Sequence, residues 1–279
     1  MKREFIPGIV HGLDIEAYHA MEPVSKSGLD SIDLSPFIFW SRHRDPRRPA
    51  PREKQGQLEG ALAHCAVLEP KEFEKRYIVG KAIHRGTKEW KEFVAAHPEH
   101  TAIQPDQYEA ATRQAVSVRA LPEIGEVLEQ GAAEVSAFWV DEETGMECRC
   151  RPDFVHDVDA DSVILLDLKT FSDPSPNEFS RQCARKAYAK QASFYTDGYE
   201  KASGKTVRAF IFIAVGNEWP YAASAMMLDE ESLEAGRRHY KRNLRTYAEC
   251  MRSGEWPGFS NGITLIRLPM WAMERAEEE

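Results

Sequence analysis

The spacing of hydrophobic and polar residues predicts helices first and a strand-rich region afterwards. Apolar positions recur with the helical period in residues 14–20, 27–32, 36–42, 54–68, 88–96 and 105–120. Shorter apolar runs then predict three strands within 132–170, a buried strand at 206–215 and its hairpin partner at 221–228. Two more helices are expected at 176–202 and 229–252. This order predicts an α/β fold in which helices flank a mixed central sheet, with an N-terminal helical elaboration.

Two of the predicted strands, 148–155 and 162–170, are joined by a short polar segment and form a candidate hairpin. If the hairpin closes symmetrically about Ala160, Asp153 lies opposite Asp167. Directly opposed side chains of antiparallel strands have Cβ atoms about 4.5–5.5 Å apart. The two carboxylates are then close enough to hold one cation.

Lys169 and the carbonyl of Leu168 extend this candidate site. Side chains alternate along a strand, so Lys169 projects on the face of Asp167 while the Leu168 side chain enters the core. Hard divalent ions such as Mg²⁺ bind oxygen ligands, which two carboxylates and a carbonyl supply. A charged lysine is no ligand, so we expect it to orient an attacking water or offset charge on a phosphate. The alternative is a surface hairpin whose lysine forms an ordinary salt bridge.

Several short motifs resemble those of one nuclease superfamily. Pro152-Asp153 and Asp167-x-Lys169 resemble the two halves of the PD-(D/E)XK motif. Three further segments resemble the RecE-type (exodeoxyribonuclease VIII) branch, which is related to the RecB nuclease domain and to lambda exonuclease: residues 24–30, Gly60-Ala61-Leu62-Ala63-His64 and Gln191-x-x-x-Tyr195. The resemblance covers residues 25–256, most of the chain.

The resemblance implies a metal centre and a catalytic set. His64, Asp153, Asp167 and the Leu168 carbonyl would hold Mg²⁺, which Mn²⁺ can replace. Lys169 would act with both aspartates in catalysis. A single helical histidine is otherwise more often a core or surface residue, so the choice of His64 rests on the motif.

The same resemblance implies contacts to DNA. Gln191 and Tyr195, four residues apart on one helical face, would contact the substrate together with Arg151. Arg185, in the same basic segment as Gln191, is a further candidate. Glu134, in the predicted strand before the hairpin, has two readings: a contact to the metal or its water, and a solvated side chain.

The activity that the resemblance implies is digestion of linear double-stranded DNA from the 5′ end. The 3′ single strand left behind would pass to a single-strand annealing protein during recombination. Relatives assemble as rings, so a homo-oligomer of three or four subunits is expected. Two alternatives stay open: an endonuclease or single-strand nuclease in repair or phage defence, and a non-catalytic DNA-binding module, against which the intact Asp153, Asp167 and Lys169 argue.

The net charge of −9 contrasts with this expectation, because DNA binders draw much of their affinity from lysine and arginine. The cations are, however, concentrated in three segments, 42–54, 181–190 and 237–245, of which 42–54 sums to +4. We assign the first two segments to DNA. Solvated helix faces are the ordinary explanation for such runs.

Length and composition fit one nuclease domain over residues 1–279. We expect a mainly helical part at 1–125, a catalytic core at 126–260 and a tail at 261–279. The five cysteines form no C-x-x-C pair, which argues against an iron–sulfur cluster and for free thiols in a reducing cytoplasm. No apolar run approaches the roughly 18 residues of a membrane span, so no membrane partner is expected.

Overall fold

A five-stranded mixed sheet forms the centre of the molecule. The structure is a computed structural model that describes residues 5–50, 56–260, 262–270 and 272–273. The strand order is β10 (Ala223–Met226), β9 (Thr206–Gly216), β8 (Ser162–Phe171), β7 (Phe154–Asp159) and β4 (Ala132–Ala133). β8 and β9 are parallel, whereas the other neighbours are antiparallel. The mixed sheet predicted from the sequence is therefore confirmed.

A second sheet contains β1 (Gly8–Val10), β5 (Ser136–Val140) and β6 (Glu147–Cys150). The prediction of one continuous strand over 148–155 is wrong, because the chain leaves β6 after Cys150 and enters β7 at Phe154. Pro152 lies in this break, and a proline has no N–H group to join a strand ladder. The break brings Arg151 and Asp153 out of regular pairing and next to the candidate site.

Helices cover both faces of the central sheet. α4 (Gln57–Leu68), α7 (Pro105–Arg119) and α8 (Ile124–Val127) pack on one face, where Leu166 and Leu168 of β8 join their core. α9 (Pro176–Lys186), α10 (Tyr188–Ser203) and α11 (Glu230–Ser253) lie on the other face, where Val163 and Leu165 point. The two-residue period of β8 thus determines which helix layer each side chain meets.

The helix predicted over 176–202 is two helices. Ala187 separates α9 from α10 in a left-handed conformation, with φ 52° and ψ 47°. This change of direction places α10 against the sheet, where its buried side includes Gln191.

Smaller elements complete the fold: α1 (Ile15–Ala20), α2 (Lys26–Leu34), α3 (Pro36–His43), α5 (Pro70–Arg76), α6 (Lys88–Ala96) and the parallel pair β2 (Tyr77–Val79) and β3 (Thr101–Ile103). The sequence did not predict α5, β2 or β3. Side chains of Ser25, Ser35 and Thr87 cap α2, α3 and α6 by accepting hydrogen bonds from main-chain N–H groups. The predicted start of the α4 helix, at residue 54, lies outside the described residues.

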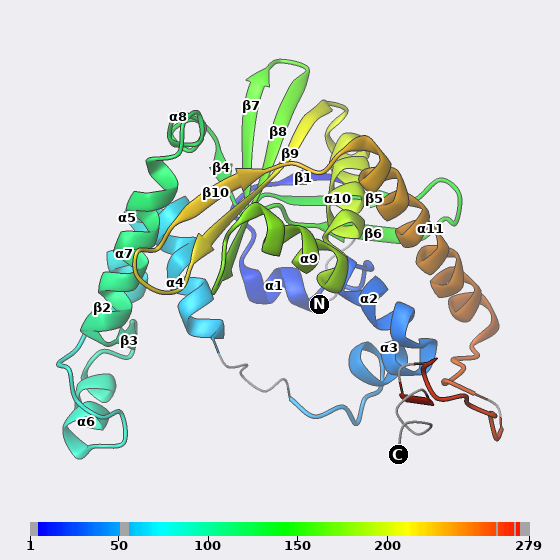
Figure 1. Cartoon of the computed structure of the whole chain (residues 1–279), viewed down its shortest axis with the longest axis horizontal. Coiled ribbons are helices and arrows are strands. Elements are labelled where there is room, and N and C mark those ends of the chain that lie inside the picture. Colours follow the sequence, from blue (N-terminus) through cyan, green and yellow to red (C-terminus); the bar gives the residue numbers. More distant parts are fainter. Residues whose placement is uncertain (1–4, 51–55, 261, 271, 274–279) are drawn as a thin grey trace.

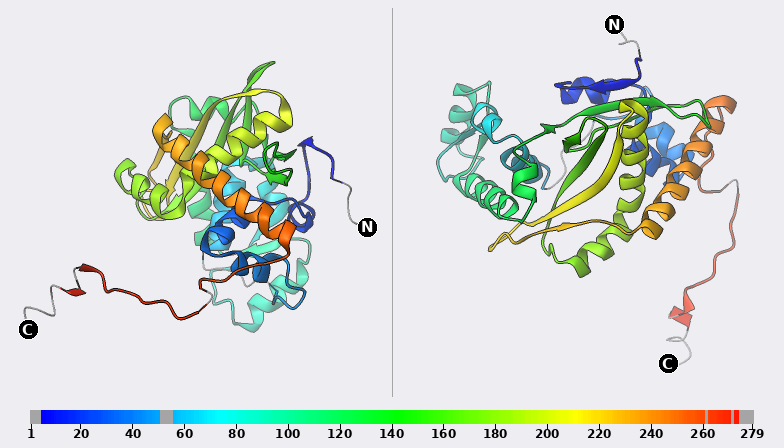
Figure 2. Two further views of the ribbon diagram at one scale, coloured as in Figure 1. Left: turned by 90° about the vertical axis from the view of Figure 1, so that its right-hand side faces the viewer. Right: turned by 90° about the horizontal axis from the view of Figure 1, so that it is seen from above.

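Figure 1 shows α4 to α7 as an arm on one side of the sheet, and α2 and α3 with the end of α11 as a lobe on the other side. Figure 2 shows the chain after α11 running away from this body. In this final segment the side chains of Ile263, Leu265 and Ile266 are almost fully exposed. None of the described helices is both long and apolar enough to cross a membrane.

Candidate active site

The hairpin of β7 and β8 has the register predicted from the sequence. Phe154 pairs with Leu166 and Asp157 with Val163, and the register shifts only near the turn, between Asp157 and Asp159. Asp153 directly precedes β7, so the same alternation brings it beside Asp167. Two acidic side chains from neighbouring strands therefore meet where the hairpin opens.

Asp153 is fixed against β8 by a main-chain contact. The Leu168 N–H donates to Asp153 Oδ2 over 2.7 Å. Burial, followed by the negative charge of Asp167, raises the pKa of Asp153 well above its usual range, while the Lys169 ammonium opposes this. A nearby cation would relieve this repulsion, because it stabilises the ionised form of both carboxylates.

Asp167 is buried between two partners. Its carboxylate forms an ion pair with the Lys169 ammonium and accepts a hydrogen bond from the Gln191 side-chain amide. Burial alone would lower the pKa of Lys169, but the charges of Asp167 and Asp153 outweigh burial and raise it. Lys169 is therefore protonated, and its Nζ lies 5.2 Å from the ring centroid of Tyr188.

His64, Glu134 and Asp153 form a group suited to a metal ion. One ligand atom from each lies within 4.8 Å of the other two. His64 Nδ1 is 3.6 Å from Asp153 Oδ2. Burial, and then the positive charge of Lys169, lowers the pKa of His64, which favours the neutral imidazole that binds metals. One nitrogen and two carboxylate oxygens fit the donor set of a divalent cation.

Glu134 belongs to this group because the chain bends at that residue. It lies between β4 and β5 with a positive φ of 55°, and its N–H donates to the Asp153 carbonyl over 2.9 Å. Arg151 Nε then donates to Glu134 Oε2 over 2.7 Å. The sequence left two readings for Glu134, and the structure places it beside Asp153 and His64 rather than in solvent alone.

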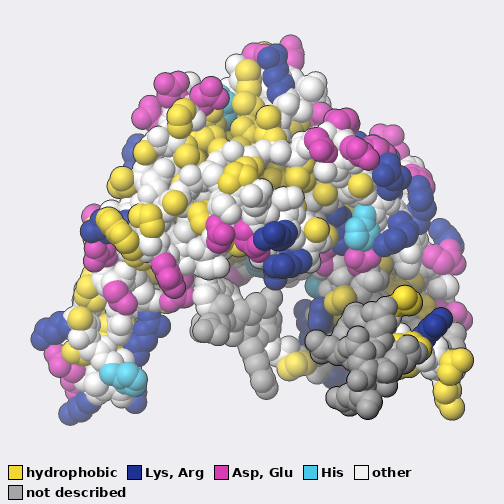
Figure 3. All heavy atoms as spheres, viewed as in Figure 1, with side chains coloured by type: hydrophobic (Ala, Val, Ile, Leu, Met, Phe, Trp, Pro, Cys, Tyr) yellow, Lys and Arg dark blue, Asp and Glu magenta, His cyan; other side chains and the backbone are white. Residues whose placement is uncertain are grey.

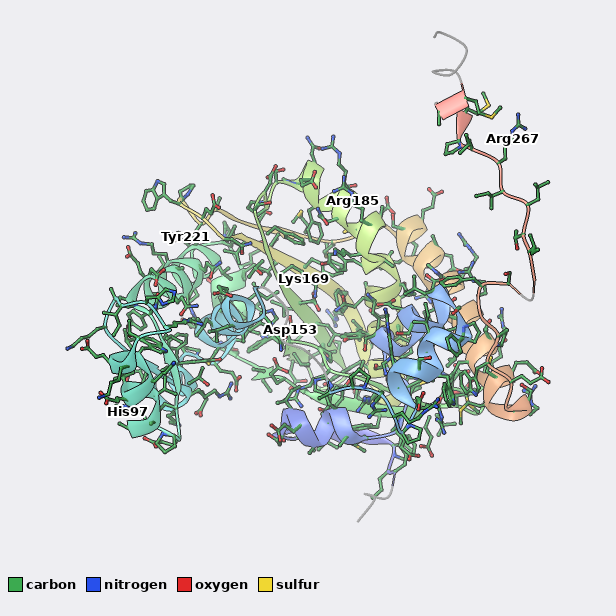
Figure 4. All side chains as sticks on the ribbon, turned by 90° about the horizontal axis from the view of Figure 1, so that it is seen from below. His97, Asp153, Lys169, Arg185, Tyr221 and Arg267 are labelled. Atoms are coloured by element: carbon green, nitrogen blue, oxygen red, sulfur yellow. The ribbon has the colours of Figure 1, made fainter. Side chains whose placement is uncertain are left out.

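The expected metal ligands are thus only partly brought together. His64 and Asp153 meet, and the Leu168 main chain is close enough to the His64 ring to oppose the lowering of its pKa. Asp167 is adjacent, but Lys169 and Gln191 occupy its carboxylate. Figure 4 shows Asp153 and Lys169 next to each other in the middle of the molecule, facing the hollow between arm and lobe.

The residues expected to contact DNA have different surroundings. Arg151 is mostly buried, and it also donates from Nη1 to the Leu13 carbonyl over 2.8 Å, so its guanidinium has internal partners, and its expected contact to DNA stays a prediction. Tyr195 lies one turn after Gln191 on α10, and burial is the main cause that raises its pKa well above the usual range. Arg185 is exposed on α9, where Glu178 pairs with it, and lies to one side of the centre in Figure 4.

The three basic segments differ in how many of their cations are exposed and how many form ion pairs. In 181–190, Lys190 has only 1% of its side chain exposed and pairs with Asp30 over 2.7 Å, so it does not face DNA. In 42–54, the arginines at 42, 44, 47 and 48 are exposed, whereas Arg52 and Lys54 lie outside the described residues. In 237–245, Arg237 and Arg245 pair with Asp197 and Glu143.

The chain matches a protein family over residues 25–269, the PDDEXK-like domain of unknown function (DUF3799). It belongs to this family. The DUF3799 match and the observed fold confirm the superfamily suggested by Pro152-Asp153 and Asp167-x-Lys169. PD-(D/E)XK nucleases generally use divalent metals, and this DUF3799 chain has the His64, Glu134 and Asp153 group that can hold one.

A solved structure with a similar fold supports the fold of this DUF3799 protein. A crystal structure of a "Putative exonuclease" from Eubacterium rectale has a TM-score of 0.60 and 11% identity, covering 95% of this chain and 98% of its own. Two further solved structures have TM-scores too low to indicate a shared fold. SSO0001 has a TM-score of 0.28 and 13% identity, covering 67% of this chain and 87% of its own. VC1899 from Vibrio cholerae has a TM-score of 0.23 and 12% identity, covering 85% of this chain and 59% of its own. No curated protein matches the chain.

Proposed function

We propose that this DUF3799 protein is a Mg²⁺-dependent exodeoxyribonuclease that degrades linear double-stranded DNA from 5′ ends. It would leave 3′ single strands for recombination. One observation carries the proposal: Asp153 is bonded to β8 within the electrostatic reach of Asp167, and Lys169 pairs with Asp167 while His64 lies beside Asp153. The family match and the fold shared with the Eubacterium rectale protein support it.

The residues fit a divalent cation for an electrostatic reason. Asp153 and Asp167 place two carboxylates in a buried region, and Lys169 supplies a single positive charge. A divalent ion bound by His64, Glu134 and Asp153 would supply Lewis-acid activation of the phosphate and offset the charge that develops on it.

Each remaining side chain has a distinct task in this proposal. Lys169 is protonated, so it acts as a donor that orients the attacking water or stabilises the phosphate oxygens and not as the base. Asp167 holds the Lys169 ammonium, and Gln191 fixes the orientation of Asp167. Arg151 fixes the orientation of the Glu134 carboxylate by donating a hydrogen bond to it.

End-labelled duplexes test the activity and its direction. Linear DNA labelled at 5′ or 3′ ends is incubated with Mg²⁺ or with EDTA, beside closed circular DNA and single strands. We expect early release of the 5′ label with Mg²⁺ only, and intact circles. Cleavage of circles would favour an endonuclease, and preference for single strands would favour a single-strand nuclease.

The proposal includes two partners that the resemblance suggests. One is a single-strand annealing protein that takes up the exposed 3′ strand, and the other is a ring of three or four copies of this chain. Light scattering of the purified protein gives the copy number directly, and a monomer at all concentrations would remove the ring from the proposal.

A further inference from the structure

A cavity of about 800 Å³ lies beside the candidate metal group. His64 and Glu134 line it, whereas Asp167, Lys169 and Gln191 do not. One wall is the face of α4 that carries Gly60 and Ala61, and the opposite wall is the N-terminal segment 12–15. The cavity therefore begins at His64 and Glu134, on the side of the candidate metal group that lacks Lys169.

We propose that this cavity receives the nucleotide released at each cut, an inference that rests on the proposed function. In phosphoryl transfer the attacking and leaving oxygens lie roughly in line, on opposite sides of phosphorus. Of the two tasks proposed for Lys169, we take the orientation of the attacking water, which places the attack on the Lys169 side. The leaving 3′ oxygen then points toward His64 and Glu134, and the nucleotide attached to it enters the cavity.

The chemistry of the cut determines what the cavity holds. The water oxygen forms a bond to phosphorus, the bond from phosphorus to the 3′ oxygen breaks, and the proton lost by the water reaches that 3′ oxygen through solvent. In digestion from the 5′ end, the released piece is a nucleoside 5′-monophosphate with a free 3′ hydroxyl. Pockets of about 300–1,000 Å³ suit ligands of this size class.

The charged side chains of the walls have partners within the protein: Arg151 donates to Glu134, and Asp14 accepts from the Glu16 and Ala17 N–H groups. A Cβ built at Gly60 would meet no atom within 4 Å, so the helix backbone is accessible there. At the far end, Arg76 donates to both oxygens of Glu69, over 2.7 and 2.8 Å, which offsets its charge. Tyr77 lies next to it and lines the same end. The cavity therefore offers space for a ligand beside the candidate metal group and no strong local charge.

Filling the cavity at Gly60 tests the inference, because a Cβ there meets no atom within 4 Å and the new side chain starts in open space. Gly60→Trp fills the space, Gly60→Ala adds one methyl group, and Val116→Trp adds the same indole on an exposed part of α7 outside the cavity. Each folded variant is titrated with Mn²⁺ and then with thymidine 5′-monophosphate by calorimetry. Digestion of the 5′-labelled duplex is followed in parallel.

We expect Gly60→Trp to bind Mn²⁺ normally, to bind thymidine 5′-monophosphate at least about ten-fold more weakly, and to release nucleotides more slowly. Gly60→Ala should lie between this variant and the wild type, and Val116→Trp should behave as the wild type. If Gly60→Trp binds the nucleotide and digests DNA normally, the cavity is not the product site. If the wild type neither binds Mn²⁺ nor cuts DNA, the proposed function itself fails.

Discussion

At the scale of single residues, a few polar side chains hold the site in place from several segments of the chain. Lys169 pairs with Asp167, Gln191 donates to the same carboxylate, and Arg151 donates to Glu134. Each contact fixes a group next to the candidate metal ion. Substitution of Lys169, Gln191 or Arg151 should therefore have a different effect from substitution of the carboxylates that they contact, Asp167 and Glu134.

Lys169→Met tests the role of the ammonium. We expect kcat for nucleotide release to fall by about 10²–10³-fold, the loss typical of one removed transition-state donor. Mn²⁺ affinity, measured by calorimetry, should not fall, because Lys169 is no ligand. Lys71→Met on the exposed surface of α5 is the matched control. Full activity of Lys169→Met would remove this residue from the catalytic set.

Arg151→Gln tests the positioning of Glu134. Loss of the 2.7 Å contact from Arg151 Nε should weaken Mn²⁺ affinity about 10–100-fold, as is typical when a partner that orients a ligand is removed. Arg208→Gln, at an exposed arginine paired with Asp159, serves as the control for loss of one guanidinium. Equal Mn²⁺ affinity in wild type and Arg151→Gln would show that Glu134 needs no such support.

At the scale of elements, the sequence was most informative where local pattern decides structure. The β7–β8 register followed from the symmetric polar turn, and α6 at Lys88–Ala96 follows from its periodicity. Glu134 could not be placed in the same way. Its positive φ interrupts a predicted strand, and its Arg151 partner is 17 residues away, after β5 and β6. Contacts between distant segments have no local signal.

The packing of α10 on α11 depends on Gly236. A Cβ at this position would meet the Ala189 carbonyl oxygen at 2.2 Å, and a backbone atom cannot move away cheaply. Gly236→Ala should therefore lower the free energy of unfolding by about 1–3 kcal/mol or more. Gly60→Ala, in open space on α4, should instead raise it by about 0.5–1 kcal/mol. Urea unfolding of both variants measures the contrast, and equal stabilities would contradict it.

Asp33 of α2 contacts Lys190 of α10 and His239 of α11, and these contacts make the stability of the fold depend on pH. Burial alone would raise its pKa, but the hydrogen bond from His239 and the charge of Lys190 lower the pKa to about 2. A depressed carboxyl pKa stabilises the fold above the unfolded value of about 4, and this contribution is lost as pH falls from 4 toward 2.

Unfolding midpoints measured from pH 7 to pH 2 check this prediction. Asp33→Asn should be less stable than the wild type near pH 7 and should lose less stability over the acid range. The Glu74→Gln variant, at an exposed residue of α5, should follow the wild-type curve. Parallel curves for Asp33→Asn and wild type would show that the contacts of Asp33 add no pH-dependent stability.

At the scale of the whole molecule, the site lies where arm, sheet and lobe meet. Figure 3 shows the molecule hollowed between the arm and the lobe, below the central sheet. The net charge of −9 belongs to the whole chain, and the arginines at 42, 44, 47 and 48 stay exposed at the end of α3 and just after it. The sequence located the candidate hairpin of β7 and β8, but the arrangement of arm and lobe around it depends on packing between distant helices.

Crystals soaked in Mn²⁺ provide the most direct test of the metal site on which this account depends. An anomalous difference map should contain a peak within about 2.6 Å of ligand atoms from His64, Glu134 and Asp153. The peak should disappear in Asp153→Asn crystals treated in the same way. Wild-type crystals with no peak at these three residues, or with the ion bound elsewhere, would contradict the account.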